Sequence, residues 1–405
     1  MFETLRARLF ARAAPRPEEA KASRTAPLIA MQAQGRAVWS PRDAASLARE
    51  GYMKNAVVYR AVTMIAESAA SVPFLAYQAA AEKPDHPLLA LFADPNRRQS
   101  GTAFFETLYA NLLTAGNAYA ELVMLGGQPA ELHALRPDRV KVVPGADGWP
   151  EAFDYTVGGA TVRFHDPGAG GIAPVLQLRL HHPLDDHYGF APIEAAAMAL
   201  DIHNAAGAWN KALLDNSARP SGALVYRGEG GATLSAEQFE RLKAELETNY
   251  TGSVKAGRPL LLEGGLDWTS MALTPRDMDF LEAKNGAARE IALAFGIPPM
   301  LLGIPGDNTY SNYAEANRVF WRQTVLPLVG RTAAAMATWL GPAYGGAVRL
   351  TYDGDAVDAL AAERESLWRR LEAASFLTRD EKREAVGYGP DGESEAKAGS
   401  ASWTS

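Results

Sequence analysis

The chain has 405 residues, 47% of them hydrophobic, and a formal net charge of −7 at pH 7. This length is ample for a large core or several smaller ones, and the acidic balance argues against a surface that attracts nucleic acid. The chain contains no cysteine, which excludes disulfides, thiolate metal sites and cysteine nucleophiles together. Stability must therefore come from packing or from partner subunits.

Residues 1–40 are predicted to form an N-terminal arm. The opening "MFETLRARLFARAAPRPEEA" is amphipathic and rich in arginine, and it lacks the continuous apolar stretch of a signal peptide. We expect a helix that docks on a neighbouring subunit, with a helix on a membrane surface as the alternative. The longest uncharged run, "IALAFGIPPMLLGIPG", contains three prolines and three glycines, which disfavours a membrane span. We therefore expect a soluble intracellular protein.

Two helices are predicted next. In "SPRDAASLAREG", Ser40 is typical of an N-cap, the following proline of a first helical turn, and Gly51 of a helix end. In "NAVVYRAVTMIAESAASVPFLAY" apolar residues recur at helical spacing before Pro73 opens a strand. The predicted apolar face consists of Val58, Val62, Ile65 and Ala69.

A third helix and a series of strands complete the first half. "TAFFETLYANLLTAGNAYAELVM" predicts a helix, a Gly-Asn turn at 116 and 117, and a strand. From 130 to 182 short strands alternate with turn signals such as "PGADGWP" and "DPGAGG", and the last strand is "PVLQLRLHH". This half is predicted to be an α+β domain.

Two long helices bracket a small α/β insert. The first, residues 191–216, starts at Pro192 and stops before a second proline. The insert contains a strand "GALVYRG", a helix capped by Ser235 and ended by Gly252, and strands in "RPLLLEGGLDWTSM". The second long helix ends before Gly296. Its expected capping group is Thr274, Pro275 and Asp277, and its expected apolar stripe is Met278, Leu281, Ala288, Ile291 and Phe295.

A polar loop, "GIPGDNTYSN", leads to the third long helix, "YAEANRVFWRQTVLPLVGRTAAAMATWL". Pro327 should kink this helix because its ring removes a backbone donor. A strand "AVRLTYDG" follows, with Asp355 expected as an N-cap. Thr378 and Glu381 then predict a capping box for the final helix, and residues 389–405 are expected to be a disordered tail.

The string "RLHHPLDDHYGFAPIE", residues 179–194, is the strongest candidate for a metal site. His181, His182 and Asp185 offer nitrogen and oxygen ligands that Zn²⁺ accepts, so a metal-dependent hydrolase is the enzymatic alternative. Against it, the two histidines end a predicted strand, where successive side chains point to opposite faces. The acidic residues also precede a helix, and negative side chains interact favourably with the positive end of its dipole. No GxSxG, HExxH or GxxxxGK[ST] motif occurs. We expect no enzyme, metal or cofactor.

The order of these elements resembles the portal proteins of tailed phages and related particles, including gene transfer particles. These are ring-shaped head-to-tail connectors at the special vertex of a capsid. The strings that carry the resemblance are "NAVVYRAVTMIAESAASVPFLAY", "HPLLALFADPN", "GNAYAELV", "REIALAFGIPPMLLGIPGDNTYSNYAEANRVFWRQTVLP" and "LTRDEKREAVGYGP". The resemblance covers about residues 40–390 and is most specific over 289–327. Two local departures are Ala191-Pro192, where the family often has Ser-Pro, and Asp380, where it often has Asn.

The resemblance implies a portal-type α+β subunit whose parts match the predicted elements. These are a wing (41–190), stem helices (191–217 and 274–296), a clip (218–273), a tunnel loop region (297–312), a long kinked helix (313–345) and a crown (346–388). It also implies a ring of about twelve copies around a channel that passes double-stranded DNA without sequence preference. An acidic bore would repel phosphates and let DNA slide. Another ring protein, such as a tail adaptor, is the structural alternative, although adaptors are usually much shorter.

The expected partners are the terminase large subunit, the head-tail adaptor and the major capsid protein, with no membrane association. The expected location is the portal vertex of the virion, reached from the host cytoplasm during assembly. The expected DNA-facing loop residues are Asp307, Asn308, Thr309 and Tyr310, which could equally form an ordinary solvated turn. The expected docking residues in the clip are Lys243, Lys255 and Arg258, which could equally be solvated surface charges.

Overall fold

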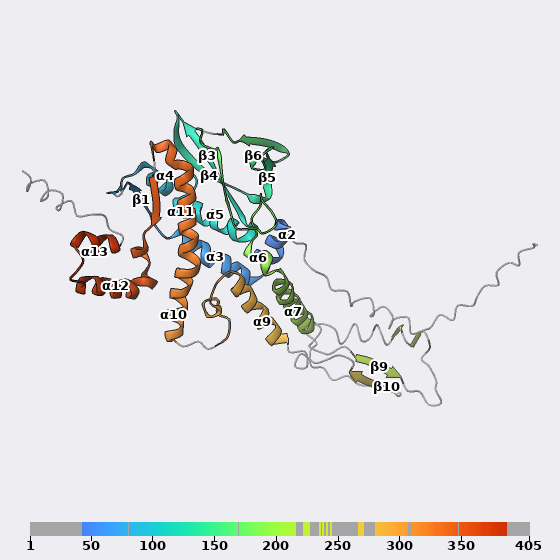
Figure 1. Ribbon diagram of the computed structural model, residues 1–405. Helices are drawn as coiled ribbons and strands as arrows, with labels where there is room; N and C mark the ends of the chain where they lie inside the picture. Colours follow the sequence, from blue (N-terminus) through green and yellow to red (C-terminus); the bar gives the residue numbers. More distant parts are fainter. Residues whose placement is uncertain are drawn as a thin grey trace, which may run out of the picture. The chain divides into compact units, whose positions relative to one another are not determined.

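The structure, a computed structural model, describes most of the chain between residues 43 and 386. The described residues are 43–79, 81–168, 170–215, 222–226, 235, 237–238, 240–241, 244, 266–270, 280–306, 310–346 and 348–386. Residues 1–39 form one unit and residues 40–405 another. The second unit combines helices with small antiparallel sheets (Figure 1). The predicted α+β class is confirmed. The predicted arm and tail lie outside the described residues.

The first described helix does not end at Gly51 as predicted. Helix α2 (Ala44–Leu47) runs into a π-helical turn, η2 (Ala48–Tyr52), so Gly51 lies inside the turn. A Cβ at Gly51 would lie 2.4 Å from Cδ1 of Ile193, so the glycine marks a close approach between two segments. The predicted cap, Ser40, lies outside the described residues. Asp43 has the capping role, because its carboxylate accepts a hydrogen bond from Ser46 N at 2.9 Å.

Helices α3 (Ala56–Ala70) and α5 (Gly101–Ala115) confirm two predictions. They pack against each other in the main core. The predicted face of α3 is buried: Val58, Val62, Ile65 and Ala69 are each at most 1% exposed. Gly116 ends α5 with a left-handed φ of 68°, and β3 starts at the next residue. The predicted Gly-Asn turn is therefore confirmed.

The predicted strands after α5 form two three-stranded antiparallel sheets, ordered β4-β3-β8 and β5-β6-β7. Their bounds are β3 (Asn117–Leu125), β4 (Gln128–Leu135), β5 (Val140–Pro144), β6 (Pro150–Val157), β7 (Ala160–His165) and β8 (Val175–Arg179). The prediction that His181 and His182 end a strand is wrong. Strand β3 begins at Asn117, so it offers no strand residue to pair beyond Arg179.

The third sheet joins distant parts of the sequence. Strand β1 (Phe74–Gln78) pairs with β2 (Ala81–Glu82) on one side and with β11 (Val348–Tyr352) on the other. Ala76 lies opposite Leu350, and both are buried. Helix α4 (Pro87–Ala93) packs against β1, and α11 (Leu326–Leu340) packs against β11. The late strand β11 therefore completes a sheet that the first half of the chain begins.

The third long helix contains a π-helical turn just before Pro327, the residue at which we predicted a kink. Helix α10 (Tyr310–Phe320) continues into η7 (Trp321–Val325), and α11 follows. Pro327 lies in the first turn of α11, where the missing N–H costs little. The helix begins at Tyr310 rather than at residue 313, where it was predicted to begin.

Both helices around the insert are present, and α9 (Phe280–Ala294) runs alongside α7 (Ala197–Asp215) (Figure 1). The first predicted helix is split at Ala196, because a short α6 (Pro192–Ala195) precedes α7. Gly296 follows α9 with a φ of 67°, as predicted. Leu281 is 72% exposed and does not belong to the apolar face of α9, whose buried residues begin at Ala287. The predicted capping group of this helix, and Met278, lie outside the described residues.

The described part of the insert is a pair of antiparallel strands and a helix start. Strand β9 (Gly222–Tyr226) pairs with β10 (Leu266–Ser270). Ser235 caps the helix as predicted. Its hydroxyl accepts from Gln238 N at 3.2 Å, while Gln238 Oε1 accepts from Ser235 N at 3.0 Å. Gly252 lies outside the described residues.

The C-terminal part has two helices, α12 (Ala361–Ala373) and α13 (Arg379–Ala385). The predicted capping box of α13 is confirmed, because Glu381 accepts from Thr378 N at 2.7 Å and donates its N–H to the threonine hydroxyl. Asp355 is not an N-cap: Asp353 caps that turn, and Asp355 contacts Arg364 instead. Among the described residues, no helix combines the length and the apolar character needed to cross a membrane.

Candidate functional site

Six of the seven residues predicted to contact DNA or a motor lie outside the described residues. They are Asp307, Asn308, Thr309, Lys243, Lys255 and Arg258. The seventh, Tyr310, is the first residue of α10 rather than part of a loop. The structure therefore describes the elements on either side of the predicted DNA-facing loop.

The segment before this loop is tied to α9 and to the π-helical turn. Thr324 in η7 donates its hydroxyl to the Gly296 carbonyl oxygen at 2.6 Å. A Cβ at Gly296 would lie 2.9 Å from that hydroxyl oxygen. A short 3-10 helix, η6 (Pro299–Leu302), follows, and the Arg289 guanidinium of α9 donates to the Pro305 carbonyl oxygen. The loop thus begins at a fixed base.

A hollow of about 480 Å³ opens beside this base, between α9, η6 and α10. Its apolar lining consists of Pro298, Pro299, Met300, Ile304, Pro305 and Ala316. Arg289, Asn312 and Glu315 supply its polar groups. Such a lining fits an apolar side chain better than a reacting polar ligand.

The predicted metal-site cluster forms a structured connection between β8 and α6. Asp185 Oδ1 accepts from the N–H groups of His187 and Tyr188 at 2.7 and 2.9 Å. These two bonds lower the pKa of the Asp185 carboxyl. His182 Nδ1 accepts from Leu184 N at 3.0 Å. The side chains therefore stabilise their own turn.

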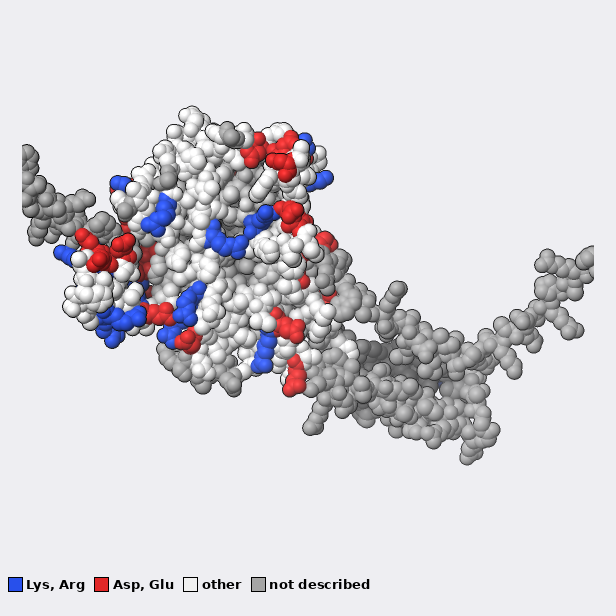
Figure 2. All heavy atoms as spheres, viewed as in Figure 1, with Lys and Arg blue, Asp and Glu red and all other residues white. Residues whose placement is uncertain are grey.

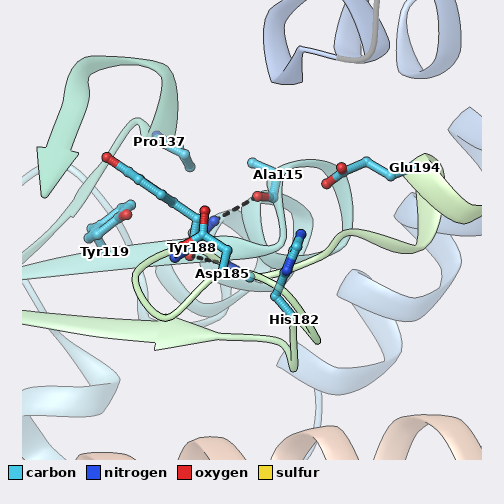
Figure 3. Close-up of a pocket in the computed structure, with 9 residues that line it drawn as sticks. Ala115, Tyr119, Pro137, His182, Asp185, Tyr188 and Glu194 are labelled. Carbon is cyan, nitrogen blue, oxygen red and sulfur yellow. Dashed lines mark hydrogen bonds between the residues drawn. The ribbon is translucent and has the colours of Figure 1, made fainter. Parts of the chain in front are cut away.

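The cluster lines a hollow of about 270 Å³ together with residues of β3 and α6. Figure 3 shows Asp185 beside Tyr188, with the imidazole of His182 and the carboxylate of Glu194 further along the wall. Glu194 accepts from the Ala191 N–H at 3.0 Å, which is one half of a capping box, and Ala191 has no side-chain acceptor for the other half. In the described part of the chain, no three histidine, aspartate or glutamate side chains are grouped as metal ligands. This geometry gives no support to the hydrolase alternative.

A buried polar network links the start of α3 to α7. Asn55, which is 2% exposed, caps α3 by accepting from the N–H groups of Val57 and Val58. Its amide nitrogen donates to His203 Nδ1 at 3.0 Å and to Asn204 Oδ1 at 2.9 Å. The asparagine before an apolar run is a cap signal in the sequence. Its partners nearly 150 residues away carry no sequence signal.

The charges on one face of the described elements are dispersed. On the face drawn in Figure 2, lysine and arginine residues lie in small groups beside acidic ones, and no continuous basic field covers the described elements. Such a face does not attract nucleic acid over its whole area.

The comparisons with known proteins point to one family. The family model described as "Phage portal protein" matches residues 56–387. An uncharacterised protein of Rickettsia bellii is 41% identical over 340 residues, which cover 84% of this chain and 88% of that protein.

Two solved assemblies share the fold of this chain. A chain in the neck of an empty gene transfer agent (GTA) particle, computed with C6 symmetry, is 53% identical with a TM-score of 0.69. The match covers 90% of this chain and 99% of that one. A chain in the neck of the native particle, computed with C12 symmetry, is 52% identical with a TM-score of 0.67, and the match covers 91% and 99%.

Proposed function

The chain belongs to the phage portal protein family, and on this premise we propose that twelve copies form a ring through which double-stranded DNA enters and leaves a capsid. The observation that carries this proposal is the match, over nine-tenths of the chain, to a particle neck with C12 symmetry. The ring is the head-to-tail connector at one vertex of a virion or gene transfer particle.

The described elements support an assignment of parts. The wing comprises the three sheets with α3, α4 and α5. The stem comprises α7 and α9, and the clip is the insert that contains β9 and β10. The crown begins after Tyr352 rather than at residue 346, because β11 pairs with β1 of the wing. The long kinked helix comprises α10, η7 and α11.

The DNA-facing loop would comprise Asp307, Asn308 and Thr309, with Tyr310 at its junction with α10. Its base supports this role, because the bonds at Gly296 and Pro305 hold the segment that leads into the loop. The acidic balance of the chain suits a conduit, since a basic bore would hold DNA by counterion release.

The clip residues Lys243, Lys255 and Arg258 would dock first the terminase large subunit and then the head-tail adaptor. The wing would contact the major capsid protein. The portal itself would act as a passive channel without catalysis, and a separate ATPase would supply the energy. Assembly would take place in the host cytoplasm.

The test is the mass of the purified native protein, combined with negative-stain imaging alone and after co-expression with capsid proteins. We expect rings of twelve with a central hole, and a thirteen-membered ring assembled outside a capsid would agree equally well. A protein that remains monomeric or dimeric under both conditions, with no ring at any capsid vertex, would refute the proposal.

A further inference from the structure

The two sheets that follow α5 have four outer edges, and three of them are met by another element. The edge strands are β4 and β8 in one sheet and β5 and β7 in the other. Beside β4, the Pro95 carbonyl oxygen accepts from Leu132 N at 2.7 Å. Beside β8, the Arg331 guanidinium donates to the last carbonyl oxygen of the strand at 3.2 Å. Beside β5, the Tyr188 hydroxyl accepts from Val142 N at 3.0 Å.

Strand β7 is the fourth edge, and it is open. Among the described residues, no backbone group of Ala160–His165 has a hydrogen-bond partner outside β6. Proteins commonly protect such an edge with charged side chains, but the arginine of β7 is held elsewhere. The Arg163 guanidinium donates two hydrogen bonds to the Asp154 carboxylate of β6, at 2.6 and 2.7 Å. Its charge is therefore directed over the sheet and away from the open edge.

The register determines which backbone groups face outward. Gly158 and Gly159 have φ values of 59° and 86°, as in the two-residue type I′ turn of a hairpin. The residues that flank this turn, Val157 and Ala160, form a hydrogen-bonded pair, and the two kinds of pair alternate from there. The residues that turn their N–H and C=O groups away from β6 are Thr161, Arg163 and His165.

The covered edge of the same sheet agrees with this alternation. Phe153 of β6 lies between Phe164 of β7 and Val142 of β5. Its backbone groups are directed toward β7, so Val142 must turn its own N–H away from β6. The Val142 N–H does point away, because it donates to the Tyr188 hydroxyl. Strand β7 therefore offers a line of free donors and acceptors at every second residue.

The side chains of β7 indicate what kind of strand fits beside it. Phe164 packs on the small core that contains Tyr119 and Val140. Val162 lies on the same face, yet it is 54% exposed. An apolar side chain on an added strand would cover Val162 and extend this core. The residues with outward backbone groups lie on the other face, which is polar. A complementary strand therefore alternates apolar and polar residues.

We infer that β7 is the docking edge of the wing, where an extended segment of the capsid shell protein adds to the sheet as a fourth strand. This inference rests on the proposed function, which brings the wing against the shell. The main chain of the added segment bonds to β7, and its alternate apolar side chains cover Val162. The occupant is extended rather than helical, because only an extended backbone matches groups that repeat at every second residue.

A neighbouring copy in the ring is unsuited to supply this strand. Contacts in a cyclic ring are head-to-tail, so β7 of one copy would have to meet a different edge of the next. The other edges of these two sheets are already covered. Two β7 edges could pair with each other only across a two-fold axis between neighbours, which a cyclic ring lacks.

Amide hydrogen exchange of the unaltered protein tests the inference. Free rings are compared with rings inside capsids that were made by co-expression with the shell proteins, and exchange is read in the peptide that spans β7. We expect this peptide to gain protection in the capsid, because its outward N–H groups become hydrogen bonded. The peptide that spans β5 is the internal control. Its edge is covered in both states, so its exchange should not change.

A pair of variants tests the same edge in assembly. Thr161→Pro removes one outward N–H and leaves the bonds between β7 and β6 in place. The matched control, Thr161→Val, loses the same hydroxyl but keeps the N–H. We expect Thr161→Pro to form rings of unchanged mass and to reduce their capture by capsids about tenfold, since one hydrogen bond is lost and its partner group is left unpaired. Thr161→Val should be captured as the unaltered protein is.

The outcomes separate this inference from the proposed function. Rings that enter capsids while β7 exchanges as in the free ring would overturn the inference and leave the portal function standing. Equal capture of the two Thr161 variants would do the same, and so would protection already present in free rings, which would assign the edge to a neighbouring copy. If Thr161→Pro forms no rings, the exchange of the unaltered protein decides. If the unaltered protein forms no ring in any state, the proposed function fails and this inference fails with it.

Discussion

Replacement of Asn55 with alanine should destabilise the protein well beyond the loss of one helix cap. The cap itself, formed with the N–H groups of Val57 and Val58, contributes about 1 kcal/mol. The substitution also leaves two acceptors without their donor, Nδ1 of His203 and Oδ1 of Asn204. A buried acceptor left unpaired costs about 1–3 kcal/mol. Because both acceptors are only partly buried, about 1 kcal/mol each is appropriate, which gives a total of about 3 kcal/mol.

The assay is urea unfolding followed by circular dichroism at pH 8. The matched control is Ser100→Ala, which removes the cap of α5, where the serine hydroxyl accepts a single bond from Ala103 N at 3.3 Å. Both variants lose a cap, but only Asn55→Ala also loses bonds to α7. We expect the shift in the midpoint for Asn55→Ala to be about three times the shift for Ser100→Ala.

The aspartate variant separates capping from the link to α7. Asn55→Asp keeps the oxygen that caps α3 but loses the amide donor, so an acceptor then faces His203 Nδ1. We expect a loss at pH 8 that recovers below pH 6, where a protonated imidazole can donate to the carboxylate. Equal midpoints for Asn55→Ala and Ser100→Ala would refute the reasoning, because the link between α3 and α7 would then have no energetic weight.

Three further predictions follow from single contacts. Burial and the nearby Lys284 charge lower the pKa of His203 below its ordinary 6.5, so the unfolded chain binds more protons at this residue than the folded chain does. The thermal midpoint should therefore fall as pH drops below about 6.5. The variant His203→Gln should reduce this dependence of the midpoint on pH. Gly116→Ala should give insoluble protein on expression, because φ is 68° and the new Cβ would lie 2.2 Å from the Gly189 carbonyl oxygen; soluble protein with an unchanged melting curve would contradict this. Thr378→Ala removes the capping box of α13 and should increase amide hydrogen exchange in the first turn of that helix while α5 is unchanged; an unchanged rate would show that the cap has no weight.

Features that depend on neighbouring residues could be predicted from the sequence. The burial of Val58 and Ile65, the left-handed Gly116 and the capping box at Thr378 each follow from spacing or from a local hydrogen bond. Features decided by distant segments could not. Gly51 looked like a helix end, yet its lack of a side chain accommodates Ile193.

The candidate site shows the same division. The polar loop and the proline-interrupted helix after it were evident in the sequence, but the π-helical turn and the bond from Thr324 to Gly296 depend on packing. The cluster around Asp185 had the residue types of a metal site. Its backbone N–H partners, which give the carboxylate another role, become visible only in three dimensions.

The pairing of β1 with β11 has a consequence for the order of folding during synthesis. Strand β1 ends at Gln78 and its long partner starts at Val348, so nearly the whole chain must leave the ribosome before that sheet is complete. Until then β1 has only the two-residue β2 beside it, and its open edge can pair with other nascent chains. A chain truncated shortly before Val348 would retain α3 and α5 but keep this edge permanently exposed. Such a product should aggregate rather than enter a ring.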